Sequence, residues 1–232
     1  MSLIQHSSNL PELAVARPPT GRVSEEEFLA WCGDDVRAEW VDGKIIMMSP
    51  ASKVHARLAR FLTSVLGDCV DERELGEVLG TGFQARLNSA LRRTPDVLFV
   101  SETSSERLLP QHLEGPPDLA MEIVSPESVD RDWRQKCSEY QAAGVREYWI
   151  IDPLQQRVEA YTLSPSGNYQ PIAPEGGRLI SSVVPGFSLR PEWLWRARPP
   201  KVSIVLKELL GLYGTIALTD ARTTADAHRA PR

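Results

Sequence analysis

Two acidic residues interrupt segments that otherwise predict buried strands. Glu122 lies inside the apolar run 119–124, and Asp96 follows Pro95 and opens the apolar run 97–100. A buried carboxylate without a partner costs several kcal/mol, so each acid is expected to pair with a cation, bind a metal ion or stay protonated. If the two strands are neighbours and the acids share a face, they form an oxygen-rich site of the kind that Mg²⁺ binds. The alternatives are a turn residue at Asp96 and an arginine partner for Glu122.

A lysine in the following helix has an unusual position. Helical spacing predicts a helix from about Asp130 to Ala143, ended by Gly144. Its apolar face is formed by Trp133, Cys137 and Tyr140. At about 100° per residue, Lys136 lies roughly 40° from Tyr140, at the inner edge of this face, and is predicted to point toward the sheet. The alternatives are a lysine that lies along the surface and an exposed i,i+4 pair with Asp132.

Two further polar residues are candidates for the same site. Glu39 lies in a predicted hairpin, where a solvated strand residue is an equally good interpretation. His55 lies on the same side of its helix as Leu62, seven residues later. A single histidine at such a position is more often a hydrogen-bonded residue at the core edge than a ligand.

The charge balance limits the possible functions. The 232 residues include 26 basic and 31 acidic side chains, for a formal net charge of −5. This balance argues against a protein that coats nucleic acid without specificity, so any nucleic-acid binding must depend on a local site. Solvated helix and loop faces explain the basic residues as well as contact with a phosphate backbone does. These residues are Lys53, Arg57, Arg60, Arg86, Arg92 and Arg93.

Targeting and membrane signals are missing from the sequence given. No run approaches the roughly 20 apolar residues of a membrane helix, and the N-terminal residues do not resemble a secretory signal. The three cysteines, Cys32, Cys69 and Cys137, lack the paired spacing of a metal site and are expected to be reduced thiols. We therefore expect a cytoplasmic protein without membrane contact.

The N-terminal elements are predicted from capping and turn residues. Residues 1–21 have the composition of a flexible tail. Ser24 and Glu27 form a capping box for a short helix that ends near Cys32. Asp42-Gly43 predicts a tight hairpin turn, and Ser49-Pro50 is expected to start a long helix. The apolar positions of that helix are Val54, Leu58, Phe61, Leu62, Val65, Leu66 and Cys69.

The rest of the chain predicts strands, one more helix and a tail. Strands are expected at residues 77–87, 96–100, 119–124, 147–152, 157–163 and 167–172, with a turn at 165–167. The expected domain covers residues 22–196, followed by a C-terminal helix and flexible tail over 197–232. The apolar stripe of this helix consists of Val202, Val205, Leu206, Leu209 and Tyr213. Such a stripe must cover its own domain or a partner, which makes a homodimer possible.

The order of these motifs resembles a known family. The series is Glu39-x-x-Asp-Gly43, His55, Pro95-Asp96-Val97, Glu122-Ile-Val-Ser-Pro126, Lys136-x-x-x-Tyr140 and Gly144 to Pro153. From Val23 to Trp195 it resembles the Uma-two family of predicted endonucleases, also called domain of unknown function 820. That family belongs to the PD-(D/E)XK superfamily of restriction-endonuclease-like proteins.

The resemblance implies an α/β (α+β) fold and a metal-dependent nuclease. The implied core is αβββαβ, with a central mixed β-sheet flanked by helices and preceded by the N-terminal helix and hairpin. Asp96, Glu122 and the Ile123 carbonyl would bind Mg²⁺ or Mn²⁺, with Glu39 and His55 nearby. The superfamily pattern has lysine where this chain has Val124, and the resemblance implies that Lys136 replaces it. Hydrolysis of DNA phosphodiester bonds would follow.

A second class of function remains open at this point. A nuclease-like fold that has lost catalysis could act as a nucleic-acid-binding or assembly module, and the missing strand lysine and the acidic composition favour it. A pair of acids in a buried setting favours the enzyme. Hydrolysis of another phosphoester would use the same metal site, so the DNA substrate rests on fold analogy.

Overall fold

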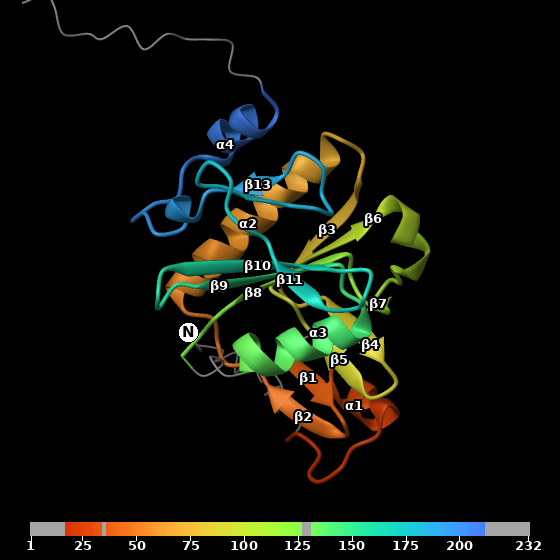
Figure 1. Ribbon diagram of the computed structural model, residues 1–232. Helices are drawn as coiled ribbons and strands as arrows, with labels where there is room; N and C mark the ends of the chain where they lie inside the picture. Colours follow the sequence, from red (N-terminus) through yellow and green to blue (C-terminus); the bar gives the residue numbers. More distant parts are fainter. Residues whose placement is uncertain (1–16, 34–35, 127–130, 212–232) are drawn as a thin grey trace, which may run out of the picture.

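The computed structural model describes residues 17–33, 36–126 and 131–211 (Figure 1). The helices are α1 (Glu25–Trp31), α2 (Lys53–Asp71), α3 (Cys137–Ala143) and α4 (Val202–Leu209). A π-helical segment, Arg131–Lys136, leads into α3, and 3-10 turns span Glu102–Arg107 and Pro191–Trp193. Of the segments predicted as tails, residues 1–16 and 212–232, which include the stripe residue Tyr213, lie outside the described residues.

The strands form two main sheets, and the larger of them is the central mixed sheet that the resemblance implies. The first has the order β2-β1-β5-β4-β7, with bounds Lys44–Met47, Ala38–Val41, Leu91–Arg93, Gln84–Asn88 and His112–Glu114. The second has the order β11-β10-β9-β8-β6-β3, with bounds Tyr169–Pro171, Arg157–Leu163, Glu147–Asp152, Leu119–Ile123, Val97–Ser101 and Gly76–Gly80. A small pair joins β12 (Leu179–Ile180) to β13 (Ser188–Leu189). The larger sheet is mixed, because β8 pairs parallel with β9 and antiparallel with β6.

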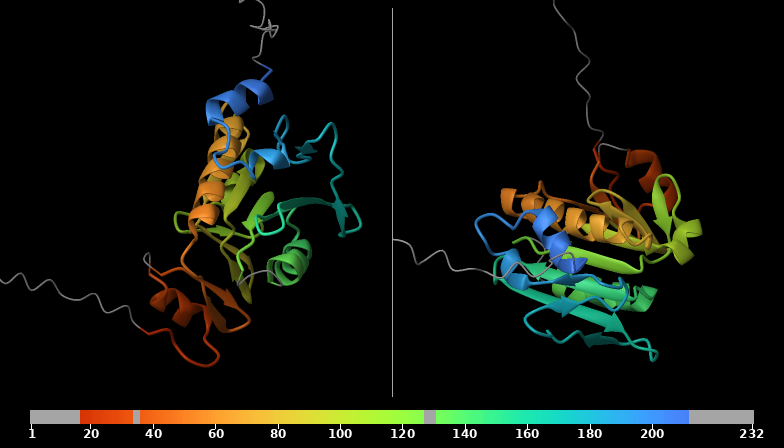
Figure 2. Two further views of the ribbon diagram at one scale, coloured as in Figure 1. Left: turned by 90° about the vertical axis from the view of Figure 1, so that its left-hand side faces the viewer. Right: turned by 90° about the horizontal axis from the view of Figure 1, so that it is seen from above.

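Helices α2 and α3 lie on opposite faces of the six-stranded sheet (Figure 2). Alternate strand residues point to opposite faces, so each buried strand contributes to two cores. Val97 and Met121 belong to the apolar core between the sheet and α2. Leu98 and Ala120 belong to a second core, which contains Tyr140 of α3. This second core also contains residues of the five-stranded sheet, among them Leu91. The result is a layered α/β fold, as the sequence predicts.

The local predictions at the N-terminus are confirmed. The hydroxyl of Ser24 accepts a hydrogen bond from the backbone N–H of Glu27, and the Glu27 carboxylate accepts one from the backbone N–H of Ser24. Asp42 and Gly43 have φ values of 46° and 77°, the left-handed conformation that a two-residue hairpin turn needs. β1 and β2 then pair antiparallel with Ala38 opposite Met47.

Two boundary predictions are wrong. Helix α2 begins after Ser52, whose hydroxyl accepts from the backbone N–H of His55, so Ser49-Pro50 lies in the preceding connection. The predicted strand 77–87 is divided between β3 and β4, which belong to different sheets, because the chain turns through Gly82 with φ of +112°. The second helix was predicted to start at about Asp130, which lies outside the described residues. Its described part begins with the π-helical turn before α3, and Gly144 ends it in the left-handed conformation, as predicted.

The C-terminal helix covers its own domain. Val205 is 1% exposed and belongs to the core of α2, against which Val202, Leu206 and Leu209 also pack. The backbone carbonyl of Leu209 accepts a hydrogen bond from Arg73, which follows the chain's long helix. The apolar stripe therefore gives no argument for a dimer, and the homodimer stays a prediction. Within the described residues, no helix is long and apolar enough to span a membrane.

Candidate active site

The two predicted acids line one cavity at the end of the six-stranded sheet. Asp96 directly precedes β6, and Glu122 lies in β8, the neighbouring strand, where Val97 is opposite Met121. Both residues are 3% exposed, and they line a cavity of about 330 Å³ that Ile123 also lines. The predicted convergence of Asp96 and Glu122 on adjacent strands is therefore confirmed.

Asp96 is held by two hydrogen bonds from different elements. Its Oδ2 accepts from the backbone N–H of Ile123 at 2.8 Å, and its Oδ1 lies 2.8 Å from Nε2 of His55. His55 is in the first turn of α2 and lines the same cavity. The histidine thus belongs to the site rather than to a separate core edge. Interpreting Asp96 as a simple turn residue is wrong, because its carboxylate bridges α2 and β8.

Glu122 is paired with the lysine that the sequence places at the inner edge of its helix. Nζ of Lys136 lies 2.8 Å from Oε1 of Glu122, and the lysine is 3% exposed. The hydroxyl of Tyr140 donates to the same oxygen at 2.6 Å. Burial raises the pKa of Tyr140 well above its ordinary value, and the negative charge of Glu122 raises it further, so the phenol stays a donor. The predicted inward direction of Lys136 is confirmed, and the surface-lysine alternative is wrong.

Glu39 is a buried member of the same charge network. Its Oε1 lies 3.3 Å from Nζ of Lys136 and accepts from the backbone N–H of Thr94, while its Oε2 accepts from Arg93 at 2.6 Å. Burial raises the pKa of Glu39, but Lys136 and Arg93 lower it by more, so the net shift is downward. Glu39 is therefore an ionised carboxylate in the interior, and its interpretation as a solvated strand residue is wrong.

The sequence did not identify two residues of this network. Arg93 is fully buried and joins Glu39 to Glu139 of α3, although its charge suggested contact with a phosphate backbone. Tyr140 was assigned to the apolar face of its helix, but its hydroxyl reaches Glu122. The available sequence signal for Arg93 was its position two residues before the Pro95-Asp96 motif.

Other predicted phosphate-contacting residues also have internal partners. Arg86 and Arg92 bind the carboxylate of Glu25, and Arg57 donates to the carbonyl of Ala197. Each of these guanidinium groups is therefore at least partly held by an internal partner, so the charge of a basic residue does not by itself identify a binding surface. Lys53 and Arg60 are exposed on α2.

The oxygen ligands of this cavity suit a hard divalent cation whose remaining ligands are water and substrate. Asp96 and Glu122 supply carboxylate oxygens at the wall of one cavity. No group of three or more histidine, cysteine, aspartate or glutamate residues suited to a metal occurs among the described residues. Mg²⁺ commonly binds through one or two carboxylates together with water and substrate phosphate, so two acids are sufficient for this type of site. The residues present therefore fit Mg²⁺ or Mn²⁺ rather than a closed structural metal site.

Comparison with known proteins shows a shared fold and then the family. The chain resembles a crystal structure described as a putative nuclease belonging to DUF820 from Anabaena variabilis ATCC 29413, with a TM-score of 0.62 and 19% sequence identity. The match covers 75% of this chain and 97% of that one, which shows a shared fold. A family model described as "Uma2: Putative restriction endonuclease" matches residues 25–192, so the chain belongs to the Uma2 family. No curated protein matches the sequence.

Proposed function

We propose that this protein is a Mg²⁺- or Mn²⁺-dependent nuclease that hydrolyses phosphodiester bonds in DNA. The observation that carries the proposal is the convergence of Asp96 and Glu122 with a buried Lys136 on one cavity. Membership of the Uma2 family and the shared fold with a DUF820 protein support it. Burial of the charges of Asp96, Glu122 and Lys136 costs free energy, and a shared role in catalysis would account for this cost.

The residues of the chain would bind and orient the reacting groups. Asp96, Glu122 and the Ile123 carbonyl would hold the cation, which would neutralise charge on the phosphate and make the attacking water more acidic. Lys136 would orient that water or stabilise negative charge as it develops on the phosphate oxygens. Its ammonium is already held by Glu122 and Glu39, so little reorganisation is needed during the reaction.

Several neighbours would act by positioning the groups that touch substrate. His55 and the backbone N–H of Ile123 fix the two oxygens of Asp96. The hydroxyl of Tyr140 fixes the carboxylate of Glu122. Arg93 and the backbone N–H of Thr94 fix the carboxylate of Glu39, which in turn positions Lys136. A shift of about 1 Å in such a group is enough to reduce a reaction rate by about 100-fold.

The decisive experiment measures cleavage of supercoiled plasmid and linear duplex DNA by the purified full chain. Cleavage is expected with Mg²⁺ or Mn²⁺ and is expected to stop with a chelator. Asp96→Asn should reduce the rate by at least about 100-fold, the effect of removing one interaction with the transition state. Calorimetric titration with Mn²⁺ should show a site that Glu122→Gln weakens.

Asp118→Asn is the matched control. Asp118 is also buried beside β8, at its opposite end, and it also accepts a backbone N–H, from Ser101 at 2.8 Å. It is outside the cavity lining, so its variant should cleave like wild type. Equal rates for Asp96→Asn and wild type would refute the proposal. DNA binding without cleavage under any metal condition would support the non-catalytic binding module instead.

A further inference from the structure

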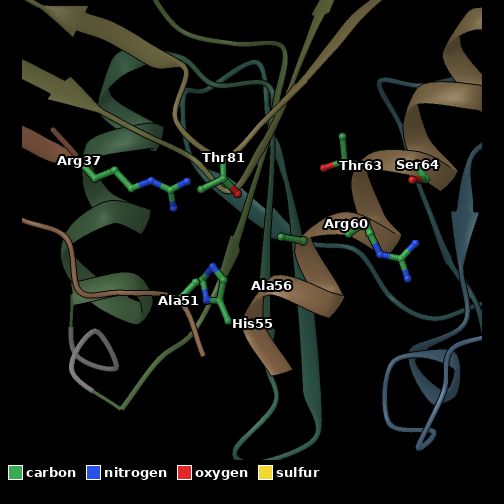
Figure 3. A pocket seen from close by; sticks show the side chains of 9 residues that line it. Arg37, Ala51, His55, Ala56, Arg60, Thr63, Ser64 and Thr81 are labelled. Carbon is green, nitrogen blue, oxygen red and sulfur yellow. The ribbon is translucent and has the colours of Figure 1, made fainter. Parts of the chain in front are cut away.

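A second cavity adjoins the candidate active site along helix α2. Its lining consists of Arg37, Ala51, His55, Ala56, Ala59, Arg60, Thr63, Ser64 and Thr81. Arg37, Ala51, His55 and Thr81 also line the cavity that contains Asp96 and Glu122, so the two cavities are direct neighbours. We call this second cavity the α2 groove (Figure 3).

The α2 groove differs from the active-site cavity in charge. Its lining includes two arginines and a histidine but no aspartate or glutamate, whereas the active-site cavity contains Asp96 and Glu122. Three hydroxyl groups, from Thr63, Ser64 and Thr81, add hydrogen-bonding capacity. The remaining lining residues are alanines, whose small side chains allow a ligand backbone to approach the helix closely.

The two arginines of the groove are available for a ligand. Among the residues that the structure describes, neither Arg37 nor Arg60 makes a side-chain hydrogen bond or ion pair. Arg86, Arg92 and Arg93, by contrast, are all paired with glutamates. Arg37 comes from the segment before β1 and Arg60 from α2, so the cations belong to elements far apart in sequence. Figure 3 shows Arg37 extending toward Thr81 and His55, with Arg60 beyond Ala56.

We propose that the α2 groove binds the phosphodiester backbone of the DNA strand next to the phosphate held at Asp96 and Glu122. This inference rests on the proposed function and deepens it. Successive phosphates of one strand repeat along the helix axis about every 3.4 Å, so a strand bound at the acids must place further phosphates outside the active-site cavity. An arginine-lined extension of that cavity provides their counter-charges, and Arg binds phosphate through paired N–H groups.

The separation of the two arginines indicates contacts with different phosphates. Arg37 stands near the shared part of the two cavities, together with His55 and Thr81. Arg60 stands one helical turn beyond Ala56, on the part of α2 that lines only the groove. Thr81 also connects the two regions, because its hydroxyl donates to the backbone carbonyl of Asp96. The groove thus leads away from the acids along the helix.

The test measures binding of labelled duplex DNA to the full chain by fluorescence anisotropy, in chelator, at several salt concentrations. The chelator prevents metal-dependent cleavage, so binding is measured independently of catalysis. Arg37→Ala/Arg60→Ala should weaken binding at least about tenfold, the effect of removing charge-assisted hydrogen bonds. The slope of log affinity against log salt should fall in magnitude by about 2, because each phosphate that is no longer neutralised lowers it by about 1.

Two further variants separate local contact from net charge. Lys201→Ala/Lys207→Ala removes the same formal charge from exposed positions at the start of α4 and within it, outside both cavities. Its affinity and salt slope should stay close to wild type. Arg37→Lys/Arg60→Lys keeps the charge and should recover most of the slope, although not the full affinity, because lysine lacks the forked geometry. Thermal unfolding checks that each variant is folded.

The possible outcomes distinguish the groove from the nuclease function. Equal binding by the double arginine variant and the lysine control would overturn the groove even if wild type cleaves DNA. If wild type neither binds nor cleaves DNA, both proposals are overturned. Weakened binding in the arginine variant, without cleavage by wild type under any metal condition, would retain the groove and reject the nuclease. Inorganic phosphate and chloride are also compared at equal ionic strength. If phosphate displaces DNA more strongly than chloride does, the groove is a site for small anions, and the proposal that it binds a DNA strand is overturned.

Discussion

The two faces of the six-stranded sheet are made by alternate residues of the same strands, but they differ in polarity. Toward α2, the sheet buries apolar residues such as Phe99, Met121 and Ile151. Toward α3, Glu122 lies between apolar positions and meets Lys136. The face toward α2 is a conventional apolar core, whereas the face toward α3 combines an apolar core with a buried charge network.

This difference separates stability from function within one sheet. Burial of a large apolar side chain stabilises a fold by about 1.5–3 kcal/mol, whereas buried ion pairs often contribute no more than apolar residues of equal volume. The charges toward α3 are therefore not needed to hold the sheet together. Their presence beside a cavity is the physical reason for assigning the reaction to that side.

The largest effect is expected from removing the central cation. Lys136→Met leaves the buried carboxylates of Glu122 and Glu39 without their shared partner. Removing one member of a buried ion pair typically costs about 3–5 kcal/mol of unfolding free energy. Urea unfolding at neutral pH measures this cost. The double variant Lys136→Met/Glu122→Gln should recover part of it, and strictly additive costs would contradict the charge-network interpretation.

A smaller and pH-dependent effect is expected at Glu39. Glu39→Gln should cost less than Lys136→Met at neutral pH, because Lys136 keeps Glu122 and Arg93 keeps Glu139 as partners. The pKa of Glu39 in the folded protein lies below its ordinary value of 4.5, so its ionisation stabilises the fold above that pH. This contribution is lost as the pH falls through the lowered pKa.

The corresponding measurement is urea unfolding of wild type and Glu39→Gln from neutral to acidic pH. The difference in unfolding free energy between them should shrink as the pH falls below about 4.5, the ordinary pKa of a glutamate. A difference that stays constant over this range would show that Glu39 is not ionised in the folded protein.

A still smaller effect is expected at Tyr140. Tyr140→Phe keeps the ring and removes the hydrogen bond to Glu122, and a hydrogen bond to a charged group contributes about 1.5–3 kcal/mol. Tyr169→Phe is the control, because Tyr169 donates to a neutral acceptor, the carbonyl of Val145, for which about 0.5–1.5 kcal/mol is expected. Equal destabilisation in the two variants would indicate that the charge of Glu122 does not strengthen the hydrogen bond from Tyr140.

The smallest effects are expected from a matched pair of apolar substitutions. Ile150 and Ile151 are adjacent in β9, are both buried and face α3 and α2 respectively. Ile150→Val and Ile151→Val should each cost about 0.5–1.5 kcal/mol, because both remove one buried methylene group. Denaturant unfolding compares them directly. Destabilisation confined to one face would show that the two cores differ in packing as well as in charge.

The sequence by itself was sufficient to predict the helices, most of the long strands and the two acids of the cavity. Capping residues and the Asp42-Gly43 turn are local signals, which explains why α1 and the hairpin were correctly predicted. Asp96 and Glu122 were recognisable because a carboxylate next to or within an apolar strand is energetically unusual. Helical periodicity correctly predicted that Lys136 points inward, although Lys136 belongs to a π-helical turn, Arg131–Lys136, and not to a regular α-helix.

Only the tertiary structure decided which of these residues meet. Asp96 and His55 are 41 positions apart, and Arg93 and Glu39 are 54 apart, so their contacts depend on strand order and helix packing. The division of the strands between two sheets was equally invisible, because the apolar pattern of a strand does not specify which other strand it pairs with. Periodicity fixes which face of an element is apolar, but a side chain's partner is fixed by the element packed against that face.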